Sequence, residues 1–157
     1  MTPTTVINAD DFLKHWQAHR RVTRRFIEVF PERELFEFSL GGMRSFSTLA
    51  LECIGMAVPS LKGVISGAWD YGTPVAPSSR EELLRLWDDT TASIDTLWPT
   101  IPPHRFHEMD KAFGQWEMTG AHLFLYLLEN EIHHRAQGSV YLRALSVEPP
   151  FFFDRGY

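Results

Sequence analysis

The sequence contains a single cysteine, Cys53, and this scarcity excludes two kinds of structure. One cysteine forms no disulfide within the chain, and it supplies only one thiolate where a zinc cluster needs several. The chain also lacks an excess of positive charge, because 15 Lys and Arg residues stand against 20 Asp and Glu residues. Nucleic acid binds best to a basic surface, so we expect no nucleic-acid partner.

Long apolar stretches are also missing. No uncharged run approaches the roughly 20 residues that a membrane-spanning helix needs. Residues 1–8 show no basic segment followed by an apolar one, which is the pattern of a signal peptide. We therefore expect a cytoplasmic protein that is not bound to a membrane. No internal repeat or low-complexity linker divides the chain, and its 157 residues suit one domain over residues 1–157.

Four helical patterns account for most of the chain. In each pattern apolar residues recur three and four positions apart, as in helices that bury one face. The patterns run over residues 10–30, 45–57, 80–98 and 119–145. The third has the strongest start signal, because Ser78 and Ser79 each precede a glutamate, Glu81 and Glu82, by three positions, the spacing of a capping box. Four such helices predict an all-α four-helix bundle.

The segments between these patterns are less regular. Pro59 either bends the second helix or separates it from residues 61–65. Residues 100–118 contain two prolines and a glycine and read as a loop, with short extended pieces at 105–113 and 115–118. The connection over residues 66–77 is long enough to cross an end of the bundle.

Polar residues interrupt the apolar face of the last helical pattern. Asn130, His134 and Gln137 share one helical stripe with Leu127 and Tyr141. Buried polar side chains cost free energy unless they find partners, so a partner is expected near His134. Asn130 and His134 stand four residues apart, one above the other on the helix, and two side chains at that spacing can reach one ion.

Glu52 is the only charged residue between Ser45 and Leu61. A carboxylate in such an apolar helix is paired with a cation, coordinated to a metal, protonated or turned to solvent. If Glu52 lies opposite His134, then Glu52, Asn130 and His134 form a three-ligand open site for a divalent ion. A surface position or an ion pair with an arginine is the alternative interpretation.

Other polar residues offer weaker candidates. Glu131 and His134 have the Glu-x-x-His spacing of di-iron bundles, but the chain contains no second Glu-x-x-His. His15 and His19 also stand four residues apart, and we expect His19 to be a core histidine bonded to a neighbour. We expect a solvated helix face for the four arginines of the first helix, which are Arg20, Arg21, Arg24 and Arg25.

Several segments resemble the DinB/YfiT-like superfamily of metalloenzymes. They are Glu131 to Gln137 in the last helix, residues 147–150 just after that helix, residues 44–51 at the start of the second helix, and residues 113–119 before the last helix. The resemblance implies an up-down-down-up four-helix bundle, often dimeric. It implies a metal held by three histidines, one in the second helix and two, four residues apart, in the last. The corresponding positions here are Glu52, Asn130 and His134, of which only one is histidine.

The resemblance leaves three functional interpretations open. In the first, the altered ligand set binds a small molecule or a weakly held divalent metal, zinc or nickel, in the bundle cleft. In the second, the protein is an active metal-dependent enzyme, a transferase, isomerase or hydrolase, whose metal activates a thiol or water. In the third, it is a metal-free structural or stress-related dimer. Residues 151–153 are three consecutive phenylalanines, and on a free tail they would form an exposed apolar patch. We expect a homodimer, with the tail folded back onto its own bundle as the alternative.

Overall fold

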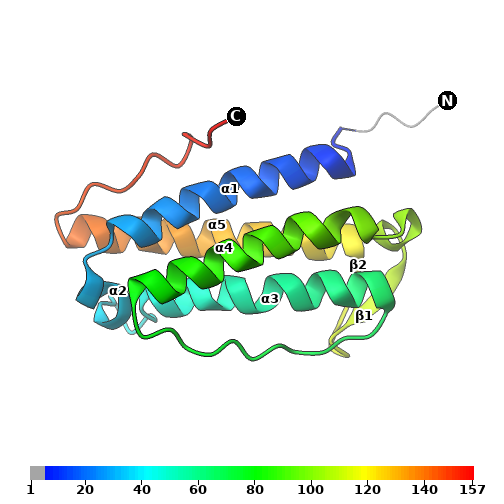
Figure 1. Ribbon diagram of the computed structural model, residues 1–157, viewed down its shortest axis with the longest axis horizontal. Coiled ribbons are helices and arrows are strands. Elements are labelled where there is room, and N and C mark those ends of the chain that lie inside the picture. Colours follow the sequence, from blue (N-terminus) through cyan, green and yellow to red (C-terminus); the bar gives the residue numbers. More distant parts are fainter. Residues whose placement is uncertain (1–5) are drawn as a thin grey trace.

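Four long helices form the body of the protein within the range that the computed structural model describes, residues 6–157 (Figure 1). These helices are α1 (Ala9–Val29), α3 (Phe46–Ser66), α4 (Arg80–Leu97) and α5 (Gly120–Ala144). Helices α1 and α5 run in one direction, and α3 and α4 run in the other. The fold is therefore the all-α four-helix bundle that the sequence predicts, in the up-down-down-up order that the resemblance implies.

Shorter elements connect the long helices. They are α2 (Glu32–Glu37), the 3-10 helices η1 (Trp98–Thr100) and η2 (Pro103–Phe106), and the strands β1 (Met109–Ala112) and β2 (Trp116–Thr119). The two strands pair as an antiparallel hairpin, with Met109 opposite Thr119 and Ala112 opposite Trp116. Both extended pieces expected in this loop are present, but the first is shorter than expected because residues 103–106 form η2. Helix α2 was not predicted from the sequence, because six residues are too few to show a helical period.

Helix α3 decides between two alternatives at Pro59, and the connection from α3 to α4 corrects one expectation. Pro59 lies inside one continuous α3, so the helix is not divided there. The segment between Ser66 and Ser79 does not cross an end of the bundle but runs back along its length (Figure 1). It must do so because α3 and α4 point the same way. Ser79 caps α4 by accepting a hydrogen bond from the N–H of Glu82 at 3.2 Å.

Helix α3 is the most apolar helix of the bundle. By length and composition alone, α3 could cross a membrane. Its most apolar window has a mean hydropathy of 1.4, although that window includes charged residues. Glu52 and Lys62 interrupt this helix, so it contains no long uncharged run. In the fold, α3 packs against α4 and α5, and 44% of that window is buried, as in the core helix of a bundle.

The core consists of two apolar clusters separated by a polar layer. One cluster includes Phe26, Phe46 and Tyr141, and the other includes Trp16 and Phe124. Along each helix the two clusters occupy opposite ends. The buried charged or hydroxyl side chains that lie between them on α1 and α5 are Arg20, Thr23, Glu131 and Arg135.

The C-terminal tail, residues 146–157, runs back along α1 (Figure 1). Arg25 Nη1 lies 3.0 Å from Asp154 Oδ2, and His15 Nδ1 lies 2.7 Å from the Tyr157 hydroxyl. The tail therefore folds onto its own bundle, which was the alternative interpretation. Its three phenylalanines nevertheless stay at the surface, with exposed fractions between 61% and 67%.

His19 joins this tail to the core, and it is buried as expected. Its Nδ1 accepts a hydrogen bond from Arg135 at 2.8 Å, and its Nε2 lies 3.1 Å from Arg155 of the tail and 3.2 Å from His15. Burial, followed by the positive charges of Arg135, His15 and Arg155, lowers the pKa of His19 to about 3. His19 is therefore neutral in the folded protein at neutral pH.

The lowered pKa of His19 predicts a loss of stability in mild acid. The unfolded chain binds a proton near pH 6.5 and the folded chain does not, so this contribution is present above pH 6.5 and is lost as pH falls toward 3. We expect the free energy of unfolding to drop between pH 8 and pH 5 by roughly 1–2 kcal/mol through this residue. Urea unfolding of the wild type and of His19→Asn, which keeps an acceptor toward Arg135, measures the difference.

The matched control for that experiment is His104→Asn, at a side chain that is 71% exposed. This control should retain the pH dependence of the wild type, and His19→Asn should flatten it. Equal slopes for all three proteins would contradict the assignment to His19.

Candidate functional site

Glu52, Asn130 and His134 converge on the seam between α3 and α5. His134 Nε2 lies 3.1 Å from Glu52 Oε1, and the Asn130 amide donates to the same oxygen at 3.2 Å. Asn130 and His134 are one turn apart on α5, so both reach the single carboxylate on α3. The juxtaposition predicted from the sequence is present, while the role of these residues as metal ligands stays a prediction.

A fourth residue, Arg44, completes this cluster. Its Nη1 donates to Glu52 Oε2 at 2.5 Å, the oxygen that His134 and Asn130 leave free. The cluster opens to solvent at this end, because the Arg44 side chain is 51% exposed while that of His134 is 9% exposed. An arginine pair was one alternative for Glu52, but the sequence did not identify the arginine, because Arg44 precedes the helix that carries Glu52.

Competing effects set the ionisation of Glu52. Burial raises the pKa of this carboxyl, but hydrogen bonds from His134, Arg44 and Asn130 lower it by more, so the pKa lies below its ordinary value. Glu52 is therefore a carboxylate at neutral pH. Because donors approach both of its oxygens, its charge is largely satisfied within the protein.

The second nitrogen of His134 is also engaged. Nδ1 lies 2.9 Å from Gln137 Oε1, and the Gln137 amide in turn contacts Met43 Sδ at 3.5 Å. Glu52 Oε1 and Gln137 Oε1 are both acceptors, so a neutral imidazole donates to only one of them, while the two contacts keep Nε2 toward Glu52. A carboxylate and an imidazole in direct contact can pass a proton between them or to a ligand at the exposed end.

The arrangement fits a divalent metal ion poorly. Two atoms 3.1 Å apart can both lie about 2.0–2.2 Å from one ion, so the spacing of Glu52 and His134 is suitable. However, Asn130 presents its N–H₂ group rather than its oxygen, and the Arg44 guanidinium binds the carboxylate. Among residues 6–157, no group of three or more His, Cys, Asp or Glu side chains is placed to hold a metal ion.

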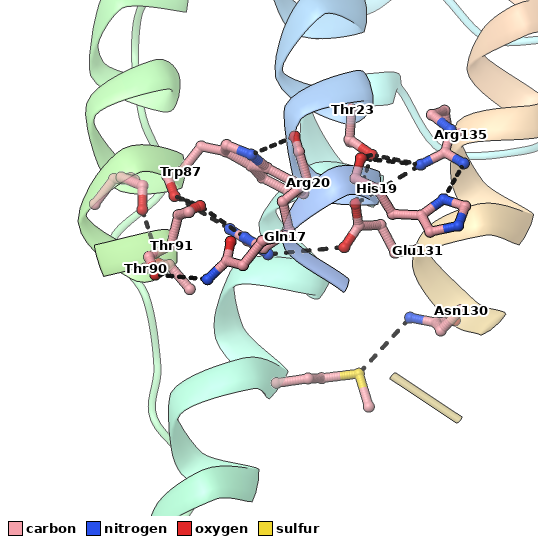
Figure 2. Close-up of polar contacts among 12 residues, drawn as sticks. Gln17, His19, Arg20, Thr23, Trp87, Thr90, Thr91, Asn130, Glu131 and Arg135 are labelled. Carbon is pink, nitrogen blue, oxygen red and sulfur yellow. Dashed lines mark hydrogen bonds and ion pairs between the residues drawn. The ribbon is translucent and has the colours of Figure 1, made fainter. Parts of the chain in front are cut away.

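A separate buried network lies on the other side of α5 (Figure 2). Glu131 is 1% exposed and accepts a hydrogen bond from Thr23 at 2.6 Å. Its two oxygens each lie 3.8 Å from a guanidinium nitrogen, one of Arg20 and one of Arg135. Glu131 therefore faces α1 while His134 faces α3, so the Glu-x-x-His pair does not share a site.

Arg20 corrects the expectation of a solvated arginine face on α1. Its guanidinium is 1% exposed, lies 3.9 Å from the Trp87 ring centroid and donates to Thr91 at 2.7 Å. The sequence does indicate that Arg20 is buried, because Arg20 stands four residues after Trp16 and three before Thr23, on the apolar stripe of the helix. Arg24 pairs with Glu28 on its own helix and with Asp88 on α4.

Cys53 is not a candidate nucleophile. The residue is 8% exposed, and burial raises the pKa of its thiol well above the ordinary range. A thiol that stays protonated is a weak nucleophile and a poor metal ligand.

Comparison with known proteins identifies the family of this bundle. The model of the DinB family matches residues 1–156. A DinB-like protein from Bacillus subtilis, YjoA, has a similar structure, with a TM-score of 0.73 and 21% identity over 90% of this chain and 96% of that chain. A DinB-like protein from Bacillus cereus ATCC 10987 has a TM-score of 0.69 and 16% identity, over 90% of this chain and 95% of that one. No curated protein matches the chain.

The buried network predicts a large effect of neutralising Glu131. Glu131→Gln leaves Arg20 and Arg135 buried without their shared counter-ion, which should lower the free energy of unfolding by about 3 kcal/mol. Urea unfolding measures this loss. The control is Glu129→Gln on the exposed face of α5, where the change should stay within about 0.5 kcal/mol. If Glu131→Gln lowers the free energy of unfolding by no more than the control does, the network does not stabilise the bundle.

Proposed function

This chain belongs to the DinB family, and we propose that it is a member whose family metal position has become a polar cluster that binds a small molecule. In this proposal a divalent ion, zinc or nickel, is held weakly at most. The observation that carries the proposal is the state of the Glu52 carboxylate, which receives donors from His134, Asn130 and Arg44. A carboxylate with this many partners has little need of a metal ion.

The chemistry of the cluster favours a ligand that accepts hydrogen bonds. Arg44, Asn130 and His134 supply donors, and Glu52 is the one anionic acceptor among them. Within residues 6–157, the Arg44 side chain bonds only to Glu52, through Nη1, and half of the side chain is exposed, so its other N–H groups are available to a ligand. A small carboxylate is the natural partner for the free edge of a guanidinium.

A metal-dependent activity is the second candidate function. The observation that favours it is the 3.1 Å spacing of Glu52 and His134, which one shared ion would also require. A carboxylate in place of a family histidine exchanges one ligand type for another. This function is the second candidate because Arg44 and the Asn130 amide already donate hydrogen bonds to the Glu52 carboxylate that the metal would need as a ligand.

Titration with acetate tests the proposed ligand class. At constant ionic strength, we expect acetate to shift the backbone amide NMR signals around Arg44 and His134 with a saturable dependence. Acetamide, which has the same shape without the charge, should give shifts at least several-fold smaller. Arg44→Gln should remove the difference between the two molecules. Equal shifts for acetate and acetamide in the wild type would overturn the proposed ligand class.

We also propose that the protein is a homodimer with the aromatic turn Phe151–Phe153 at or near the interface. These three rings are exposed on a tail that is itself held against α1 by Asp154 and Tyr157. An apolar patch on a fixed segment is typical of surfaces that contact another protein. The ordered tail thus favours an interface more than a free tail would.

Light scattering tests this assembly. We expect the wild type to have the mass of a dimer at micromolar concentration. Replacing Phe151, Phe152 and Phe153 by serine should shift the equilibrium toward monomer, because the change keeps the Asp154 and Tyr157 contacts and removes only the patch. A monomeric wild type would contradict the dimer, and an unchanged dimer in the serine variant would place the interface elsewhere.

A further inference from the structure

We propose that Arg44 is the residue that keeps divalent metal ions out of the Glu52–Asn130–His134 cluster, as a built-in cation in place of a bound ion. This inference rests on the proposed function, in which that cluster is the ligand site and holds metal weakly. The weak binding of metal is then due mainly to Arg44, which is not one of the three positions that correspond to the family's ligands.

The geometry places Arg44 where it competes directly for the carboxylate. Arg44 Nη1 is 2.5 Å from Glu52 Oε2, while Oε1 receives Asn130 and His134. A metal ion that used Glu52 as a ligand would have to share the carboxylate with this guanidinium or displace it.

The charge of Arg44 acts against a metal ion under all ordinary conditions. A guanidinium does not lose its proton in proteins, so its positive charge is permanent. A divalent ion on Glu52 and His134 would lie within a few ångströms of that charge. Even in the dielectric of water, charges of two and one at roughly 5 Å repel strongly enough to change an affinity about tenfold.

Arg44 is also fixed in position by the core. Its backbone carbonyl accepts a hydrogen bond from the Tyr141 hydroxyl at 2.9 Å, and Tyr141 is fully buried on α5. Tyr141 lies seven residues, or two turns, after His134 on the same helix. The helix that presents His134 therefore also anchors the backbone of Arg44 near the cluster, and the bond to Glu52 holds the half-exposed guanidinium there.

Isothermal titration with Zn²⁺ on the full-length protein tests this inference. The variants are Arg44→Gln, which removes the charge, and Arg44→Lys, which keeps it. The control is Arg143→Gln on α5, at a side chain that is 64% exposed. We expect Arg44→Gln to raise the affinity for Zn²⁺ at least tenfold, and the other two variants to stay within about threefold of the wild type. The visible absorption of Co²⁺ bound to each variant should follow the same order.

A second variant shows whether the additional Zn²⁺ affinity of Arg44→Gln arises from binding in this cluster. Glu52→Gln added to Arg44→Gln should abolish the gain, because it removes the anionic ligand. Unchanged affinity in Arg44→Gln, or a gain that survives Glu52→Gln, would overturn the inference. Circular dichroism checks the fold of each variant, and Arg44→Ala serves as the second neutral substitution if Arg44→Gln is unstable.

The outcome is distinguishable from a failure of the proposed function. Tight, stoichiometric zinc in the wild type would overturn both the weak metal site and the role of Arg44. Absence of acetate binding overturns the proposed ligand class, whereas the order of zinc affinities among the Arg44 variants is measured separately and decides the role of Arg44.

Discussion

The interior of this bundle depends on the pairing of one buried carboxylate, Glu131, with Arg20 and Arg135. These charges lie where α1, α4 and α5 meet, between the two apolar clusters of the core. Buried charges of this kind are tolerated only when each finds its partners, so the relative placement of the helices is restricted to arrangements that bring the partners together. The net charge of the three groups is +1, and the guanidinium groups also donate hydrogen bonds to Thr91, Trp87 and His19.

This constraint also orients the outer cluster. Glu131 and Arg135 stand four residues apart on α5 and face α1, so the positions just before each of them, Asn130 and His134, face α3. One helix thereby serves two polar sites, one sealed in the core and one opening to solvent. The sealed site sets the rotation of α5, and that rotation brings His134 opposite Glu52.

The C-terminal tail is tied to the same interior. His19 accepts from Arg135 on one side and contacts His15 and Arg155 on the other. A continuous chain of polar contacts thus runs from the buried carboxylate to the surface turn that carries the exposed phenylalanines. The position of the tail along α1 therefore follows from the same charges that hold the bundle together.

The four long helices could be predicted from the amino-acid sequence, because periodicity and capping are local properties of the chain. Helices α1, α4 and α5 begin and end close to the predicted residues. The lone charge of Glu52 indicated that this side chain needs a partner, and the resemblance to the family pointed to His134. Which further partners each charge uses depends on how the helices pack. Arg20 enters the core and Arg44 reaches Glu52 from outside α3, because a long guanidinium side chain can serve either environment and its neighbours on other helices select between them.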